Sequence, residues 1–309
     1  MERIEVRASD GVRLAGTVHD SDPGAPTVVL VHGFPDTSRV WDEVVEVLAP
    51  SHRVVTYDVR GAGGSDAPVS RRGYRLPQLA DDLVAVLDAV SPDAPAHVVG
   101  HDWGGIQAFE AATTPHRAAR MASFTCISGA SFDHAGRMLR RDLAATVRRP
   151  FALADVVGQL ARSWYILLFQ LPVLPEQSFE RGVGARVLEM MEPVPHRDGH
   201  PADTFVRDGS NGVNLYRANL GRVLRPRRDR VHVPVQVVVG EGDPVLTPHL
   251  FDELAVLADD AWLRVVDGAH WLPRTHPEVV AGNVADVVAH VAGGDAPGLH
   301  GARLTAAGA

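Results

Sequence analysis

Residues 96–105 read Ala-His-Val-Val-Gly-His-Asp-Trp-Gly-Gly, and this stretch decides the fold. It begins with an apolar run typical of a buried strand and ends where helical spacing starts. Gly100 and Gly104 flank Asp102. A sharp strand-to-helix turn that exposes one side chain needs small neighbours, because larger Cβ atoms would clash. The pattern therefore predicts that Asp102 stands at such a turn, although an aspartate that merely caps the following helix would also fit these residues alone.

Strands and helices alternate on both sides of this turn. The segment Ser9-Asp10-Gly11 separates two short alternating runs and predicts a hairpin over Arg3–Arg7 and Val12–His19. The alternation indicates βαβ units that build a parallel sheet. We expect strands at 27–31, 52–57, 96–99, 121–128, 233–239 and 261–266, and helices at 38–48, 79–90, 105–113, 250–258 and 277–291.

The alternation stops near residue 130 and resumes near residue 231. Between them the chain reads as helical and irregular, with helical spacing at 151–169 and 214–224 and several interrupting prolines. We therefore expect a core formed by residues 1–130 and 231–293 and a helical cap formed by residues 131–230. The tail 294–309 is rich in glycine and alanine, and we expect it to be disordered.

Composition and charge exclude several classes of protein. The 309 residues carry a formal net charge of −8 and no long basic run, so no nucleic-acid partner is expected. Cys126 is the single cysteine, which rules out a disulfide within one chain and fits a reducing compartment. No apolar stretch approaches the roughly 20 residues that span a bilayer. We expect a cytoplasmic protein without a membrane span, as a monomer or a homodimer.

The motifs and their order resemble the α/β-hydrolase superfamily and, within it, epoxide hydrolases of actinobacterial type. The resemblance covers nearly the whole chain and implies a mostly parallel, eight-stranded sheet with the cap inserted after the sixth strand. His32-Gly-Phe-Pro resembles the oxyanion-hole turn of this family. The family implies that the backbone N–H groups of Phe34 and Trp103 form the hole and that the Phe34–Pro35 peptide bond is cis. The segment Asp58-Val-Arg-Gly-Ala-Gly-Gly-Ser resembles a family segment with a structural role.

The resemblance implies that Asp102 is the nucleophile. A nucleophile of this kind needs a base, and the base needs an acid to orient it. In this fold the chain order is nucleophile, acid, histidine. Gly240-Glu-Gly-Asp243 resembles the acid turn and assigns that role to Asp243, with Glu241 as the rival. Asp267-Gly-Ala-His270-Trp resembles the histidine turn and assigns the base to His270, with His276 as the alternative.

Two cap segments resemble those that carry the ring-opening tyrosines of epoxide hydrolases. They are Ser163-Trp-Tyr165 and Asn214-Leu-Tyr216. The alternative for either residue alone is packing on an amphipathic helix. Four further residues in or beside these motifs are expected to contact the substrate: His32, Pro35, Trp164 and Trp271.

An aspartate nucleophile suits displacement at a saturated carbon, because attack on an acyl group would give a reactive anhydride. An epoxide or an alkyl halide fits this chemistry. An alkoxide leaving group needs a proton, which a tyrosine can donate. The sequence therefore predicts an epoxide hydrolase that acts on an epoxide and water. No cofactor is expected. The alternatives are a haloalkane dehalogenase with the same nucleophile and, from another class, a non-catalytic ligand receptor. His196, Asp198 and His200 are near one another in the sequence, but Gly199 and Pro201 beside them favour a loop over a metal site.

Overall fold

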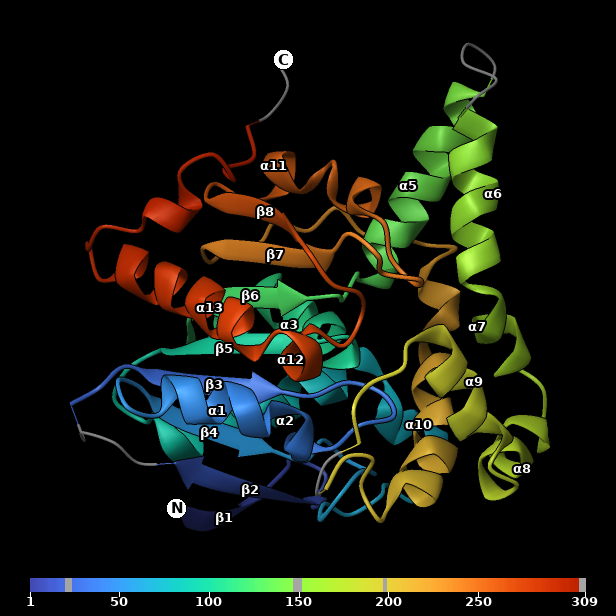
Figure 1. The fold of residues 1–309 in the computed structure, drawn as a ribbon, viewed down its shortest axis with the longest axis horizontal. Helices are drawn as coiled ribbons and strands as arrows, with labels where there is room; N and C mark the ends of the chain where they lie inside the picture. The colour runs from blue at the N-terminus through green and yellow to red at the C-terminus, as the bar shows by residue number, and fades with distance from the viewer. Residues whose placement is uncertain (20–23, 147–151, 197–198, 306–309) are drawn as a thin grey trace.

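A mixed sheet of eight strands forms the centre of the protein (Figure 1). The computed structural model describes residues 1–19, 24–146, 152–196 and 199–305. The strand order is β1-β2-β4-β3-β5-β6-β7-β8, in which β1 and β2 are antiparallel to their neighbours and the other pairs are parallel. The predicted α/β-hydrolase architecture is confirmed. The strands are β1 (Glu2–Arg7), β2 (Arg13–His19), β3 (Thr27–Val31), β4 (Arg53–Tyr57), β5 (Ala96–His101), β6 (Met121–Ile127), β7 (Val235–Gly240) and β8 (Ala261–Val266).

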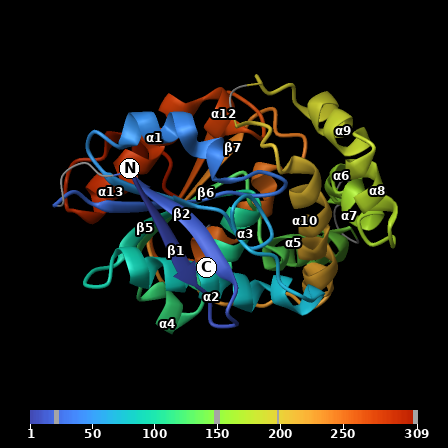
Figure 2. The same cartoon turned by 90° about the horizontal axis from the view of Figure 1, so that it is seen from below.

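Helices cover both faces of the sheet, so its central strands are buried. Figure 2 shows α1, α12 and α13 on one face and α2, α3 and α4 on the other. Burial on both faces explains the continuous β-branched runs, such as Val28–Val31, which is fully buried. The helices of this core are α1 (Asp42–Leu48), α2 (Leu76–Val90), α3 (Trp103–Ala112), α4 (Pro115–Ala118), α11 (Leu254–Leu257), α12 (Leu272–Thr275) and α13 (Pro277–Val291).

Between β6 and β7 the described residues form six helices, which gather beyond the carboxyl ends of the parallel strands (Figure 1). The helical spacing predicted over 151–169 is divided at Ser163, and Phe151 itself lies outside the described residues. The predicted helix at 214–224 begins nine residues earlier, at Phe205. These inserted helices are α5 (Phe132–Ala145), α6 (Ala152–Arg162), α7 (Trp164–Leu168), α8 (Leu174–Glu180), α9 (Val183–Met191) and α10 (Phe205–Asn219).

The first half of α10 has a weak helical pattern but many tertiary contacts. The Asp208 carboxylate accepts a hydrogen bond from Gly63 N at 3.0 Å, and the Phe179 ring packs against Gly209. A Cβ at position 209 would lie 2.4 Å from that ring, so glycine is required there despite its low helix propensity. Tertiary packing therefore extends the helix beyond what local spacing predicts.

The expectation of a disordered tail is wrong for residues 294–305. Ala296 and Leu299 are buried against Trp262 and Val287. The backbone of the tail also pairs with β8, since Leu304 N donates to Ala261 O at 2.8 Å. Apolar side chains at two positions are enough to anchor a segment whose composition is otherwise that of a linker. Residues 306–309 lie outside the described part of the chain.

No helix in the described ranges has both the length and the apolar character needed to cross a bilayer.

Candidate active site

Asp102 occupies a strained turn between β5 and α3. Its backbone has φ 49° and ψ −117°, a conformation that side-chain-bearing residues rarely adopt. A Cβ on Gly104 would lie 2.0 Å from Val31 O, and one on Gly100 would lie 2.5 Å from the backbone of Gly104. Glycine is therefore required at both flanking positions, as the sequence predicts. The turn presents the Asp102 side chain at the end of the sheet where the inserted helices gather.

Two backbone N–H groups lie beside the Asp102 carboxylate. Phe34 N donates to Oδ1 at 2.8 Å, and the N–H group of Trp103 is near enough to favour the charged form of the carboxyl group. The Phe34–Pro35 peptide bond is cis, as predicted. Burial raises the pKa of Asp102 to about 6, although His270 and the two N–H groups favour the charged form. The carboxylate is thus ionised at neutral pH, and the N–H group of Phe34 holds its Oδ1 atom.

His270 lies between two carboxylates. Its Nδ1 is 3.1 Å from Asp243 Oδ2, and its Nε2 is 3.8 Å from Asp102 Oδ2. Burial lowers the pKa of His270, but Asp243 and then Asp102 outweigh this effect and hold it at about 9. Burial likewise raises the pKa of Asp243, but the positive charge of His270 outweighs it, and the net pKa is lowered. The structure therefore brings the three predicted residues together in a linear arrangement.

The rivals for these positions lie elsewhere. Glu241 is exposed, whereas Asp243 is buried and accepts hydrogen bonds from Val245 N and Leu246 N. His276 begins α13, and its Nδ1 lies 2.9 Å from the hydroxyl of Thr275. Neither rival contacts the Asp102 carboxylate in the described structure.

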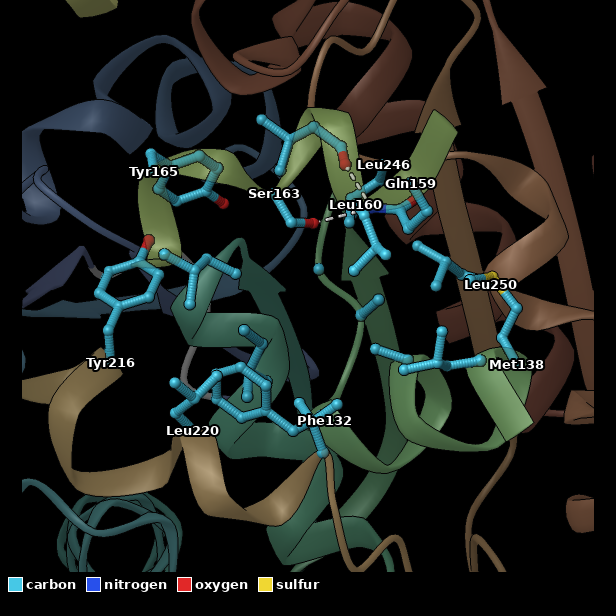
Figure 3. A pocket seen from close by; sticks show the side chains of 18 of the residues that line it. Phe132, Met138, Gln159, Leu160, Ser163, Tyr165, Tyr216, Leu220, Leu246 and Leu250 are labelled. Carbon is cyan, nitrogen blue, oxygen red and sulfur yellow. Dashed lines mark hydrogen bonds between the residues drawn. The ribbon is translucent and has the colours of Figure 1, made fainter. Parts of the chain in front are cut away.

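A cavity of about 290 Å³ opens beside Asp102 (Figure 3). Its walls come from α5, α6, α7, the end of α10 and the loop after β7. They are almost entirely apolar; Gln159 is an exception, and its side chain donates to Ser163 Oγ and to Val245 O. A second, smaller cavity of about 110 Å³ also has Asp102 in its wall, together with Phe34, Trp164, His270 and Trp271.

Tyr165 and Tyr216 line both cavities. Tyr165 comes from α7 and Tyr216 from α10, and their rings meet edge to face with centroids 5.8 Å apart. Tyr216 also packs against the rings of Phe34 and Trp103. Burial, and after it the charge of Asp102, raises the pKa of Tyr165, and burial raises that of Tyr216 as well. Both phenols therefore keep their protons and can act as donors.

Two residues expected to contact the substrate do not reach these cavities. His32 is fully buried: its Nε2 accepts a hydrogen bond from Val59 N at 2.9 Å, so its Nδ1 donates to Gly33 O. Pro35 lines a separate small cavity near His200. The structure contradicts the expectation for His32 because its two ring nitrogens bind the backbone of Val59 and Gly33, and it contradicts that for Pro35 because this residue lines the separate cavity. Trp164 and Trp271 do line the smaller cavity.

The described residues hold no group of three metal-ligating side chains. His200 Nε2 is instead 2.8 Å from Asp36 Oδ1, while Asp198 lies outside the described residues. The opposite oxygen of Asp36 accepts a hydrogen bond from the indole N–H of Trp271 at 2.9 Å.

Three supporting residues escape sequence reasoning. Asp36 directly follows the His32-Gly-Phe-Pro turn and His101 directly precedes Asp102, so their positions beside these motifs could have indicated a supporting role. His101 Nε2 is 3.0 Å from His270 O, and burial lowers the His101 pKa to about 4, so the ring is neutral and donates. Glu192 follows α9, where no local pattern marks it, yet its carboxylate accepts a hydrogen bond from His270 N at 2.6 Å.

Comparisons with known proteins agree with this geometry. A model of the alpha/beta hydrolase fold matches residues 26–277. Epoxide hydrolase A of Mycobacterium tuberculosis is 30% identical in an alignment 317 residues long that includes 88% of this chain and 93% of the relative. The probable oxidoreductase EphD of the same organism is 37% identical over 296 residues, which cover 93% of this chain and 49% of EphD. The chain thus spans about half the length of EphD.

The solved structure of epoxide hydrolase VrEH1 from Vigna radiata has the same fold. Its TM-score is 0.73 at 20% identity, with 93% of this chain and 97% of that chain covered. The family model spans the Asp102, Asp243 and His270 turns, and the similarity to epoxide hydrolase A covers 88% of this chain. The chain therefore belongs to the α/β-hydrolase superfamily and, within it, to the epoxide hydrolase family.

Proposed function

We propose that this chain hydrolyses apolar epoxides to vicinal diols through a covalent ester on Asp102. One observation carries the proposal: an ionised carboxylate and two protonated phenols share the walls of two apolar cavities. A halide leaving group would take no proton, whereas the alkoxide from an epoxide requires one. The pair Tyr165 and Tyr216 thus favours the epoxide over the halide. Residues 131–230 act as the cap that encloses both cavities.

In the first step Asp102 attacks a ring carbon. Phe34 N–H holds Oδ1, which leaves Oδ2 as the attacking oxygen. A carbon–oxygen bond of the ring breaks, and a phenol of Tyr165 or Tyr216 gives its proton to the oxygen that leaves. The products are an alkyl ester on Asp102 that carries a hydroxyl, and one phenolate.

In the second step neutral His270 takes a proton from water, and the resulting hydroxide adds to the Asp102 carbonyl carbon. The negative charge that develops on the carbonyl oxygen lies between the N–H groups of Phe34 and Trp103, and one such donor is typically worth about 3–4 kcal/mol. Collapse breaks the bond between the Asp102 carbonyl carbon and the alkoxide oxygen, and the alkoxide takes the proton of the added hydroxyl group, which releases the diol and regenerates the carboxylate. The proton held by His270 then returns to the phenolate, which resets the site.

A single turnover in heavy-oxygen water tests this route. Because water attacks the Asp102 carbon, we expect the heavy oxygen in the Asp102 carboxylate and not in the first diol released. Mass spectrometry of the peptide that contains Asp102 and of the diol measures both. Direct attack of water on the ring would label the diol instead, and release of halide from haloalkanes with no epoxide turnover would identify a dehalogenase.

The two steps should respond differently to pH. Asp102 has a pKa of about 6 and must be ionised to attack, so alkylation slows as the pH falls through about 6. Alkylation neutralises Asp102, which removes one of the charges that hold the pKa of His270 at about 9. Ester hydrolysis needs neutral His270, so its rate should rise with pH through a pKa below that value. Stopped-flow fluorescence resolves the two phases, and a hydrolysis rate that is independent of pH would contradict the role of His270.

The larger cavity should set the tolerated chain length. Met138 lies at the opposite end of this cavity from Tyr165 and Tyr216 (Figure 3), so tryptophan there should shorten the space without touching the reacting groups. We expect Met138→Trp to lower kcat/KM for long-chain alkyl epoxides by about 10-fold or more and to leave a short epoxide within about 2-fold. Equal losses for both substrates would show that the long chain does not occupy this space. Thermal unfolding of the variant checks its fold.

A further inference from the structure

The segment after α9 returns from the cap to the turn that carries His270. Glu192 lies at its start, with a buried side chain that is 8% exposed. Its Oε2 accepts hydrogen bonds from His270 N at 2.6 Å and from Trp271 N at 3.1 Å. A buried carboxylate is costly unless donors compensate for its lost hydration. Two backbone donors from adjacent residues provide that compensation here, so the contact is specific to this turn.

Two further contacts join the same segment to the same turn. Arg274, four residues after His270, donates from Nη2 to Pro195 O at 3.4 Å and from Nη1 to the Glu43 carboxylate. His200 and the indole N–H of Trp271 bind the two oxygens of Asp36. The cap therefore contacts the histidine turn at several points, and among these contacts Glu192 is the one that binds the backbone of the catalytic residue itself.

We propose that Glu192 is a positioning residue through which the cap holds the His270 turn, and that its negative charge makes His270 a stronger base. The inference rests on the proposed function, because it assigns Glu192 a part in hydrolysis of the Asp102 ester. Glu192 touches neither the substrate nor the reacting atoms; it acts through the backbone of His270.

The charges around His270 explain why this contact matters most in the intermediate. Asp243 lies 3.1 Å from one ring nitrogen and Asp102 lies 3.8 Å from the other. Glu192 is a further carboxylate that raises the pKa of His270. In the substrate-free protein His101 and the Tyr165 phenol beside the ring are neutral, and the Asp36 carboxylate is bound by His200 and by the indole N–H of Trp271. Once Asp102 is an ester, its own charge no longer stabilises the protonated imidazole that forms when water is deprotonated. That task then falls to the carboxylates of Asp243 and Glu192 and to the phenolate left by ring opening.

The charge and the hydrogen bonds can be tested separately. In Glu192→Gln the amide oxygen still accepts from the backbone, but the negative charge is gone. In Glu192→Ala both are lost. Glu189→Gln is the matched control, because it removes an exposed carboxylate from the last turn of α9, three residues before Glu192. The measurements are the rate of ester hydrolysis against pH by stopped-flow fluorescence, and the titration of the His270 ring by NMR in substrate-free protein.

In Glu192→Gln we expect the His270 titration and the pH profile of hydrolysis to move to lower pH by about 0.5 unit or more. The rate at the optimum should stay within about 3-fold of the natural protein. In Glu192→Ala, hydrolysis should slow by about 10-fold or more at unchanged KM, because the turn loses its anchor. Glu189→Gln should behave as the natural protein does. A purely structural glutamate would change the thermal stability but not the pH profile.

The inference is overturned if Glu192→Gln leaves both pH dependences where Glu189→Gln leaves them. If Glu192→Ala does not fold, the glutamine variant and the NMR titration still decide. The two proposals fail in different ways. An absence of heavy oxygen in Asp102 of the natural protein refutes the covalent route, whereas an unmoved His270 titration in a protein that does label Asp102 refutes only the role of Glu192.

Discussion

Replacing His270 by glutamine is expected to stop the protein at the covalent ester. Asp102 can still attack an epoxide, since its Oδ1 remains held by Phe34 N–H and the two phenols remain in place. Water then lacks its base, and ester hydrolysis should slow by about 10⁴-fold or more, as for other residues that act within a catalytic triad. Intact-protein mass spectrometry should show an increase equal to the mass of one epoxide, located on Asp102 after digestion.

Two control variants sharpen this experiment. Asp102→Ala should show neither the mass increase nor turnover, because no nucleophile is present. His276→Gln should turn over normally, since His276 makes no contact with the Asp102 carboxylate and directly precedes α13, where its ring lies beside the Thr275 hydroxyl. A trapped ester in His276→Gln, or none in His270→Gln, would show that the base has been assigned to the wrong residue.

Removing both cap phenols should abolish ring opening. Tyr165→Phe and Tyr216→Phe each delete one hydroxyl and keep the ring. The edge-to-face packing of Tyr216 with Phe34 and Trp103, and that of Tyr165 with Phe169, is therefore preserved. We expect each single variant to slow alkylation by about 10- to 100-fold, because the second phenol can still donate, and the double variant to slow it by about 10³-fold or more. The alkylation phase in stopped-flow fluorescence measures this loss.

The control for these variants is Tyr74→Phe. Tyr74 is also buried, at 3% exposure, but lies outside both cavities. It should leave alkylation unchanged. If the double cap variant alkylates as fast as the natural protein, the phenols are packing residues. If it loses epoxide turnover but still releases halide from haloalkanes, Asp102 attacks both kinds of substrate and the phenols are needed only for the epoxide.

Local patterns were sufficient for the sheet and for the turn that bears Asp102. The β-branched run at Thr27–Val31 can be satisfied only by burial on both faces, and the glycines around Asp102 leave the backbone no room for larger residues. Chain order placed the acid in the turn after the strand at 233–239, and the resemblance to the family's acid turn favoured Asp243 over Glu241 within it. Such features depend on contacts between residues that are near in sequence or on a repeated strand order.

Segments in which apolar residues do not recur at a regular spacing were harder to predict. The start of α10 and the path of the tail depend on side chains that pack against distant elements, such as Phe179 against Gly209 and Leu299 against Trp262. His32 stands in a motif that suggests substrate contact, yet its ring binds the backbone at Val59 and Gly33. A motif identifies a residue type at a turn, but the neighbours that compete for its polar atoms come from elsewhere in the chain.

By itself, the sequence determined the parallel sheet and the turn that bears Asp102, because steric limits and strand order act locally, and its resemblance to a family pointed to Asp243 and His270 as the residues beside Asp102. Only the tertiary structure decided that two apolar cavities meet at Asp102, that Tyr165 and Tyr216 border both, and that Glu192 reaches the histidine turn. Those features depend on how the inserted helices dock over the sheet. Docking is set by shape and burial between segments that are far apart in the chain, which no local pattern records.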